Sequence, residues 1–216
     1  MEKNKGSKII AIVALVVAVF GLTLGFAAFS NTLTISSSAY VSPSSDNFKI
    51  NFSTSSTSAT ATGNVTGSPT GAATAATATL AGTTVSGIKA NLTAPGETVS
   101  YTFYTHNTGE YDAFLNSITF ENVAGQSAPK VCAAVDPNTT TASLVSAACE
   151  DISVSVKVGS DAAVSGSKAT ISNHKLLKTA NEAIVVTITY DANGDRADGA
   201  FNVTFGDLKL VYGTVD

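Results

Sequence analysis

Residues 95–120 read PGETVSYTFYTHNTGEYDAFLNSITF, and this stretch decides the fold. From Thr98 to Thr105 apolar residues alternate with Ser and Thr, a period of two that is typical of a strand with one buried face. The residues from Asn107 to Gly109 predict a turn, in which Gly109 is free to adopt a positive φ. A second strand is predicted from Ala113 to Phe120, although Leu115 lies on the opposite parity from its other large apolar residues.

Similar patterns recur on both sides of this stretch. Large apolar residues occupy even positions from Phe48 to Phe52, and the segment from Thr139 to Cys149 is the only internal one expected to form a helix. Later strands are predicted at residues 152–158, 184–190, 201–205 and 208–212. Strands at this spacing, separated by Gly, Asn and Pro, are typical of two antiparallel sheets packed face to face. We therefore expect an all-β fold, a jelly-roll or immunoglobulin-like antiparallel β-sandwich, preceded by an N-terminal hydrophobic helix.

The composition limits the classes of function. The chain has 216 residues, of which 44% are hydrophobic and 13% charged, so it can bury one substantial core. Its 12 basic and 16 acidic residues give a net charge of −4, and the lysines form no basic stripe. Such a surface repels phosphate groups, so we expect no nucleic-acid partner.

The N-terminus carries the signals of export. Lys3, Lys5 and Lys8 precede an uncharged, mainly apolar run of 21 residues from Ile9 to Phe29. This run exceeds the roughly 7–15 residues of a signal-peptide core and is close to the roughly 20 that span a bilayer.

Two fates of this segment stay open. Residues 1–28 are either a signal peptide, which a signal peptidase cleaves between Ala28 and Phe29, or a retained membrane anchor. Cleavage after Gly6 with the helix retained, as in type IV pilins, is a further alternative. In each case the lysines stay on the cytoplasmic side, so we expect an extracellular or cell-surface protein exported through the cytoplasmic membrane.

Residues 29–216 are expected to form a single β-sandwich domain. Within it, the segment 53–87 is rich in Ser, Thr and Ala and carries no charge. Low-complexity tracts of this kind often form linkers or glycosylated stalks. Small β-prone residues can equally form short strands, and the loose alternation around Leu80 and Val85 favours strands in the later part.

The two cysteines, Cys132 and Cys149, predict a disulfide, because an exported chain meets an oxidising compartment and holds no other cysteine. Metal binding would need more ligands than the chain offers in one motif. The only histidines, His106 and His174, have no recognisable ligand spacing, and each is interpreted as a solvated turn residue.

Catalytic motifs are absent from the sequence. The serines form no Gly-x-Ser-x-Gly elbow, and neither histidine stands in a motif of a general base, so we expect no enzyme and no cofactor. A weak calcium candidate lies in the string DANGDRADG, with oxygen ligands at Asp191, Asn193, Asp195 and Asp198. Arg196 takes the place of the sharp-turn Gly and Asn202 that of the bidentate Glu. A long hairpin loop with a turn at Asn193 and Gly194 is the favoured interpretation.

Two stretches resemble a known family. The end of the apolar run, LGFAAFSNT from Leu24 to Thr32, resembles the signal peptides of the TasA/camelysin family of secreted biofilm-matrix fibre proteins. There Gly, an aromatic residue, small residues and Phe surround the cleavage site. The stretch from Pro95 to Phe120 resembles the Pro-Gly, strand, Asn-x-Gly, strand core of that family and of other bacterial surface sandwiches. The resemblance implies cleavage between Ala28 and Phe29, and a secreted sandwich that assembles into extracellular fibres.

The residues after that cleavage point suggest a means of assembly. The new N-terminus would be an uncharged segment in which Phe29, Leu33 and Ile35 alternate with polar residues. Such a segment can add to the sheet edge of a neighbouring copy as a donated strand and bury those side chains there. We therefore expect a secreted, non-enzymatic structural subunit of extracellular fibres or biofilm matrix that self-associates into filaments. The alternative is an adhesin-like binding module, membrane-anchored or secreted, that acts as a monomer.

Overall fold

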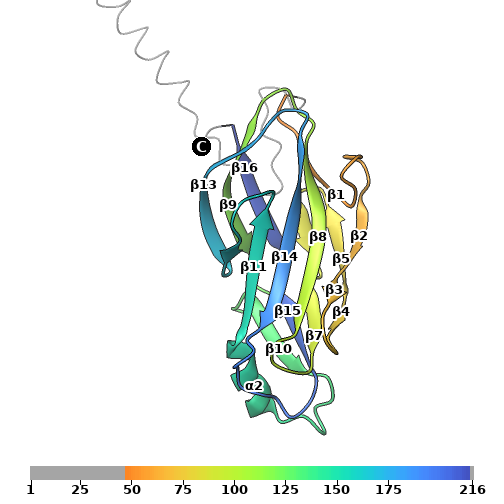
Figure 1. Ribbon diagram of the computed structural model, residues 1–216, viewed down its shortest axis with the longest axis vertical. Coiled ribbons are helices and arrows are strands. Elements are labelled where there is room, and N and C mark those ends of the chain that lie inside the picture. The colour runs from red at the N-terminus through yellow and green to blue at the C-terminus, as the bar shows by residue number, and fades with distance from the viewer. Residues whose placement is uncertain (1–46, 215–216) are drawn as a thin grey trace, which may run out of the picture. The chain divides into compact units, whose positions relative to one another are not determined.

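The computed structural model describes residues 47–214, all within one compact unit of the chain (Figure 1). The expected N-terminal helix, the cleavage site at Ala28 and Phe29, and the donor residues Leu33 and Ile35 lie outside these residues. Every strand pair in the described part is antiparallel. The expected all-β, sandwich-like fold is therefore confirmed.

One layer is sheet A, whose three long central strands lie in front in Figure 1. Its order is β1 (Ile50–Ser53), β8 (Thr98–Asn107), β14 (Asn181–Tyr190), β11 (Ile152–Val158) and β12 (Val164–Ser165), and the two-residue β3 (Ser68–Pro69) also pairs with β8. Along most of β8 and β14, buried side chains alternate with more exposed ones, and the last three residues of β8 are all buried. This alternation matches the period of two in the sequence.

The second layer consists of two sheets. Sheet B has the order β13 (Lys168–Leu176), β9 (Ala113–Phe120), β16 (Leu208–Gly213), β6 (Thr84–Ser86), β5 (Thr77–Ala81) and β2 (Gly63–Thr66). Sheet C has the order β10 (Lys130–Ala134), β15 (Phe201–Phe205), β7 (Lys89–Leu92) and β4 (Thr74–Ala75). The chain passes directly between the two sheets four times, from β4 to β5, from β6 to β7, from β9 to β10 and from β15 to β16. The Phe205 amide donates to the Ile88 carbonyl at 3.0 Å, which joins the second and the last of these crossings.

A single core cluster fills the space between the layers. Aromatic pairs mark contacts across it: Tyr190 of sheet A lies edge-on to Phe201 of sheet C, with ring centroids 5.6 Å apart. The Tyr212 hydroxyl of sheet B lies 3.4 Å from the Thr105 hydroxyl of sheet A. Both sheets of the second layer therefore pack on sheet A.

A β-bulge explains the parity change in β9. Val211 pairs with Ser117 but the next residue, Tyr212, pairs with Leu115, so Asn116 is the extra residue on β9. A bulge of this kind shifts the alternation by one position. Leu115 and Ile118 consequently both point into the core, at 0% and 2% exposure.

The turn after β8 has the expected position, but the reason for its glycine differs from the prediction. Gly109 does not adopt a positive φ. A Cβ there would lie 2.7 Å from the Asn47 carbonyl oxygen and 2.8 Å from the Lys49 amide nitrogen, so the glycine permits a close backbone approach. Gly96, by contrast, has φ +91° and follows Pro95 in the turn before β8, as a type II turn requires.

The Ser/Thr/Ala-rich segment forms the short strands β2 to β6, so the strand interpretation applies and the stalk interpretation does not. Its few larger apolar residues are buried, including Leu80 and Val85. Small residues are needed where the segment crosses between sheets. A Cβ at Gly67 would come within 2.9 Å of the Val99 and Tyr101 side chains.

Candidate functional site

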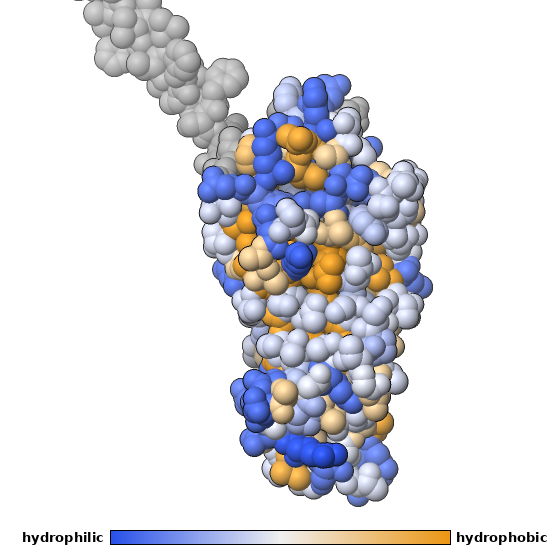
Figure 2. All heavy atoms as spheres, in the orientation of Figure 1, coloured by the Kyte–Doolittle hydropathy of each residue, from blue (hydrophilic) through white to orange (hydrophobic). Residues whose placement is uncertain are grey.

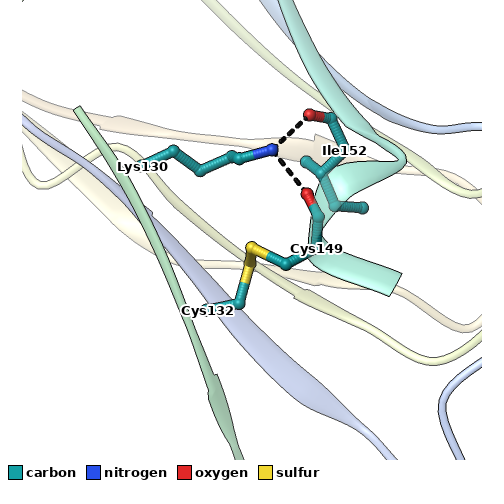
Figure 3. Close-up of a disulfide and its surroundings, with 4 residues drawn as sticks. All are labelled: Lys130, Cys132, Cys149 and Ile152. Atoms are coloured by element: carbon teal, nitrogen blue, oxygen red, sulfur yellow. Dashed lines mark hydrogen bonds between the residues drawn. A yellow bond between two sulfur atoms is a disulfide. The ribbon is translucent and has the colours of Figure 1, made fainter. Parts of the chain in front are cut away.

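The predicted disulfide joins Cys132 of β10 to Cys149 of α2 (Ala142–Glu150), with the two Cα atoms 6.0 Å apart (Figure 3). Lys130 lies beside it, and its Nζ donates to the carbonyls of Cys149 at 2.5 Å and Ile152 at 2.8 Å. Burial lowers the pKa of Lys130, although Glu150 and Asp151 oppose the effect. The ammonium satisfies carbonyls at the end of α2, where a cation is favourable.

The acidic loop does not join a hairpin, so that prediction is wrong. β14 belongs to sheet A and β15 to sheet C, and the loop between them crosses from one layer to the other. The predicted turn exists, because the Gly194 amide donates to the Asp191 carbonyl at 3.1 Å. Gly194 is required there because a Cβ would lie 2.7 Å from that of Asp151.

The four calcium candidates are partly used in holding this crossing. Asp198 accepts from the amide and hydroxyl of Thr141, at 2.9 and 2.5 Å. Asp191 accepts from the amide of Asn193 at 2.8 Å. The amide of Asp195 donates to Asp151 at 2.6 Å. Between residues 47 and 214, no three His, Cys, Asp or Glu side chains form a group that could hold a metal ion.

The densest cluster of ionisable groups surrounds His174, which sequence reasoning did not identify as a site. Its Nδ1 lies 2.6 Å from Asp161, in the turn between β11 and β12, and its Nε2 lies 2.8 Å from Glu182 on β14. The other oxygen of Glu182 accepts from the Tyr212 hydroxyl at 3.2 Å. The cluster therefore joins β13 and β16 of sheet B to β14 of sheet A.

Burial by itself would lower the pKa of His174, but the bonds to Asp161 and the charge of Glu182 outweigh it and raise the pKa above the ordinary 6.5. The cationic form is thus favoured between the carboxylates. Both ring nitrogens are engaged, and no hydroxyl or thiol nucleophile is bonded to the imidazole in the described part. A general base needs one free nitrogen facing its substrate, which this arrangement does not offer.

The interpretation of the histidines as solvated turn residues is wrong for both. His106 is 7% and His174 8% exposed. His106 lies in β8, and its Nε2 lies 2.7 Å from the Ser55 carbonyl oxygen. The residues that contact these rings lie 8 to 51 positions away in the sequence and at no recognisable motif spacing.

A buried carboxylate, Glu97, fixes the turn before β8. It is 6% exposed and accepts from the amides of Thr93, Ala94 and Ala72 at 2.7–3.2 Å. Burial raises its pKa, but the hydrogen bonds from the Thr93 side chain and the three amides outweigh burial and lower it. Its role is structural, because all these donors belong to the chain's own turns.

The edges of sheet A differ in their backbone pairing. Beyond β11, the short β12 pairs with Ser155 and Val156, and the Val154 carbonyl accepts from Gly166, so that edge is largely covered. At the other edge, β1 pairs with β8 through Asn51 and Ser53. In an antiparallel pair alternate residues bond to opposite sides, so Phe48 and Ile50 turn their backbone groups outward.

Among the described residues, a single outward bond forms on this β1 edge, from the Phe52 amide to the Gly82 carbonyl at 3.0 Å. Within residues 47–214, no partner satisfies the outward groups of Phe48 and Ile50. An edge of this kind can pair with another strand. It is therefore a candidate acceptor for an added strand.

The described residues contain no helix long and apolar enough to span a bilayer. The chain matches no protein-family model, no curated protein and no solved structure.

Proposed function

We propose that this protein is a secreted, non-enzymatic structural subunit of extracellular fibres or biofilm matrix, in which the N-terminal segment of one copy adds as a strand to a neighbour. The outer edge of β1 carries this proposal, because among the described residues it is paired only at Phe52. It offers backbone donors and acceptors at Phe48 and Ile50, beside a core that already buries Ile50 and Phe52. A donated strand would complete this ladder.

The donated segment would also bury apolar side chains. Burying Phe29, Leu33 and Ile35 contributes about 5 to 9 kcal/mol gross, at roughly 1.5–3 kcal/mol each. Backbone pairing along the β1 edge then helps to offset the loss of translational and rotational freedom. Each copy would donate its segment to the edge of the next copy. Such head-to-tail addition does not close on itself, so it produces filaments.

The described part of the chain also supports a non-enzymatic role. The carboxylates of Glu97, Asp161, Glu182 and Asp198 all accept hydrogen bonds from the chain itself or contact its histidine. Each of these groups fixes a turn or joins two strands. These four carboxylates are therefore accounted for by structural roles.

The experiment compares mature protein beginning at Phe29 with a variant that lacks residues 29–38. We expect the mature protein to form filaments in electron microscopy and sedimentation, and the deletion to remain monomeric. Leu33→Asp with Ile35→Asp should act like the deletion, because buried carboxylates without partners are strongly unfavourable. Ser37→Ala is the matched control and should assemble normally.

A synthetic peptide of residues 29–38 provides a second test. It should bind the deletion variant and raise its melting temperature, whereas the peptide with both Asp substitutions should not. If the mature protein stays monomeric at high concentration and across pH, or if the deletion still forms filaments, the donor-strand proposal is wrong. A cell-surface binding module that acts as a monomer would then be the better account.

A further inference from the structure

Four large apolar side chains are strongly exposed within the described residues, and they lie in two pairs. Tyr111 and Leu177 are each 55% exposed, Val135 is 47% exposed and Leu144 is 41% exposed. The first pair lies on the loops that follow β8 and β13. In the second pair, Val135 directly follows β10 and Leu144 lies on α2.

The loops that carry Tyr111 and Leu177 form one surface, which we call the entry end. The Asn107 side chain donates to the carbonyls of Tyr111 and Leu176, at 2.8 and 3.2 Å. Beside them the amide of Glu110 donates to the carbonyl of Asn47 at 2.9 Å. The chain therefore enters the described fold next to Tyr111.

The segments that carry Val135 and Leu144 form a second surface, which we call the helix end. It comprises residues 135–151 and the crossing loop 191–200. The Val135 amide donates to the Ala200 carbonyl at 3.0 Å, and Asp198 bonds to Thr141 at the start of α2. The two segments are therefore held together.

The entry end and the helix end lie at opposite ends of the strands. In sheet A, β14 pairs with β8 from Asn181 and His106 at the entry end to Thr189 and Thr98 near the helix end. A ten-residue strand is about 30 Å long. In Figure 1 α2 lies at the bottom and the loop after β8 at the top, and Figure 2 shows apolar patches bordered by hydrophilic residues at both ends of the visible face.

The two ends differ in charge. The helix end has one basic residue, Arg196, and six acidic residues, a net charge of −5: Asp136, Glu150, Asp151, Asp191, Asp195 and Asp198. The loops of the entry end carry Lys49, Lys178, Glu110 and Asp112, and Lys175 lies beside them at the end of β13, which together give a net charge of +1. Including His174 as a cation with Asp161 and Glu182 makes the entry end neutral. Two helix ends would repel each other, whereas a helix end and an entry end would not.

We propose that the helix end of one copy docks on the entry end of a second copy, with Val135 and Leu144 packed against Tyr111 and Leu177. This inference rests on the proposed function and specifies the axial contact of the filament. Two different surfaces meet, so the contact repeats from copy to copy without closing. The 18 residues from Phe29 to Asp46 can extend about 60 Å, which is enough to run along the docked neighbour to its β1 edge.

Single substitutions at each end test the contact in mature protein beginning at Phe29. Leu144→Asp at the helix end and Leu177→Asp at the entry end should each raise the critical concentration for filament formation by at least about tenfold, because each removes a buried apolar contact. Thr102→Asp, on an exposed position of β8, is the matched control and should assemble like the parent. Circular dichroism should show all three variants to be folded.

A mixing experiment tests whether the contact joins two different surfaces. Leu144→Asp keeps an intact entry end, and Leu177→Asp keeps an intact helix end. Below the raised critical concentration, neither variant alone should associate, but an equimolar mixture should form 1:1 dimers in sedimentation and no filaments. A mixture that stays monomeric while each variant remains folded would overturn the proposal.

A charge exchange tests the electrostatic part. Lys178→Glu and Asp195→Lys should each weaken assembly, and the double variant should restore it at low salt. If the double variant does not restore assembly, Lys178 and Asp195 do not face each other. The proposed contact between the entry end and the acidic helix end would then be wrong.

The deletion of residues 29–38 separates this inference from the donor-strand proposal. If the deletion blocks assembly but both Asp variants at the ends assemble normally, end docking is wrong and donor-strand addition stands. If the Asp variants block assembly but the deletion does not, donor-strand addition is wrong and end docking stands. A parent protein that never assembles overturns both.

Discussion

His174 connects the two layers through charge, since β13 and β16 belong to sheet B while Glu182 lies on β14 of sheet A. Its partner Asp161 is half-exposed and Glu182 is largely buried. The sequence could not predict this cluster, because its members lie on four segments that come together only in the folded chain. The disulfide between Cys132 and Cys149, by contrast, was predictable from the expected export and from there being only two cysteines.

Removing the charge of His174 should weaken the folded state. The pKa of His174 is raised, so its contribution to stability is complete below the unfolded value of about 6.5 and is lost as the pH rises through the folded value. We expect His174→Gln to lower the melting temperature most at about pH 6 and progressively less toward about pH 9. Thermal unfolding across this range measures the effect. His106→Gln, whose parent ring contacts a carbonyl and no carboxylate, is the control, and an equal effect of His174→Gln at all pH values would contradict the prediction.

Glu97 gives the opposite dependence on pH. Its pKa is lowered, so the stability that its carboxylate contributes is present above the ordinary value of 4.5 and is lost as the pH falls through the folded value. Glu97→Gln turns an amide donor toward three backbone amides and should cost about 1–3 kcal/mol at neutral pH. Urea unfolding measures the loss. The exposed Glu150→Gln should change stability little, and equal losses in the two variants would refute the role given to Glu97.

The strands themselves followed from alternation, and their order in the sheets did not. The predicted strands 113–120, 152–158 and 201–205 coincide with β9, β11 and β15. Alternation identifies a strand but does not say which sheet receives it, so the loop after β14 was wrongly expected to join a hairpin. The parity change in β9 likewise needed the paired strand β16 to be recognised as a bulge.

The link between α2 and β10 should be a main source of the stability of this region. The chain-entropy estimate for a loop of this size is about 3 kcal/mol. We expect Cys132→Ser with Cys149→Ser to lose about that amount in urea unfolding, and local hydrogen exchange in α2 to increase. Thiol labelling of the exported parent without reduction should be negative. Stoichiometric labelling of both cysteines would show that the bond does not form.

At the scale of the whole molecule, the acidic loop connects the two layers, and this explains why its carboxylates serve the fold. Asp198 and Asp191 already accept hydrogen bonds from the chain. Asp and Asn side chains can bind calcium, and they also stabilise the loop that crosses between the layers. Composition alone could not distinguish a calcium site from a structural loop.

Calcium should consequently change the melting temperature of the protein little. A site with an affinity near 10 μM would contribute about 2.7 kcal/mol at millimolar calcium, a shift of several degrees that is easily measured. Differential scanning fluorimetry with calcium and with a chelator tests this. A large rise that Asp195→Ala abolishes would show that the loop is a genuine calcium site.

The bond between Cys132 and Cys149 also determines how far the molecule can be stretched. Fully extended, 17 residue steps reach about 60 Å, but the bond holds the two Cα atoms 6.0 Å apart. When the chain is pulled from its two ends, tension passes through the sulfurs and bypasses the segment between them, including α2. An oxidised molecule therefore yields about 50 Å less length when it unravels, and it behaves as a stiffer link under load than its reduced form.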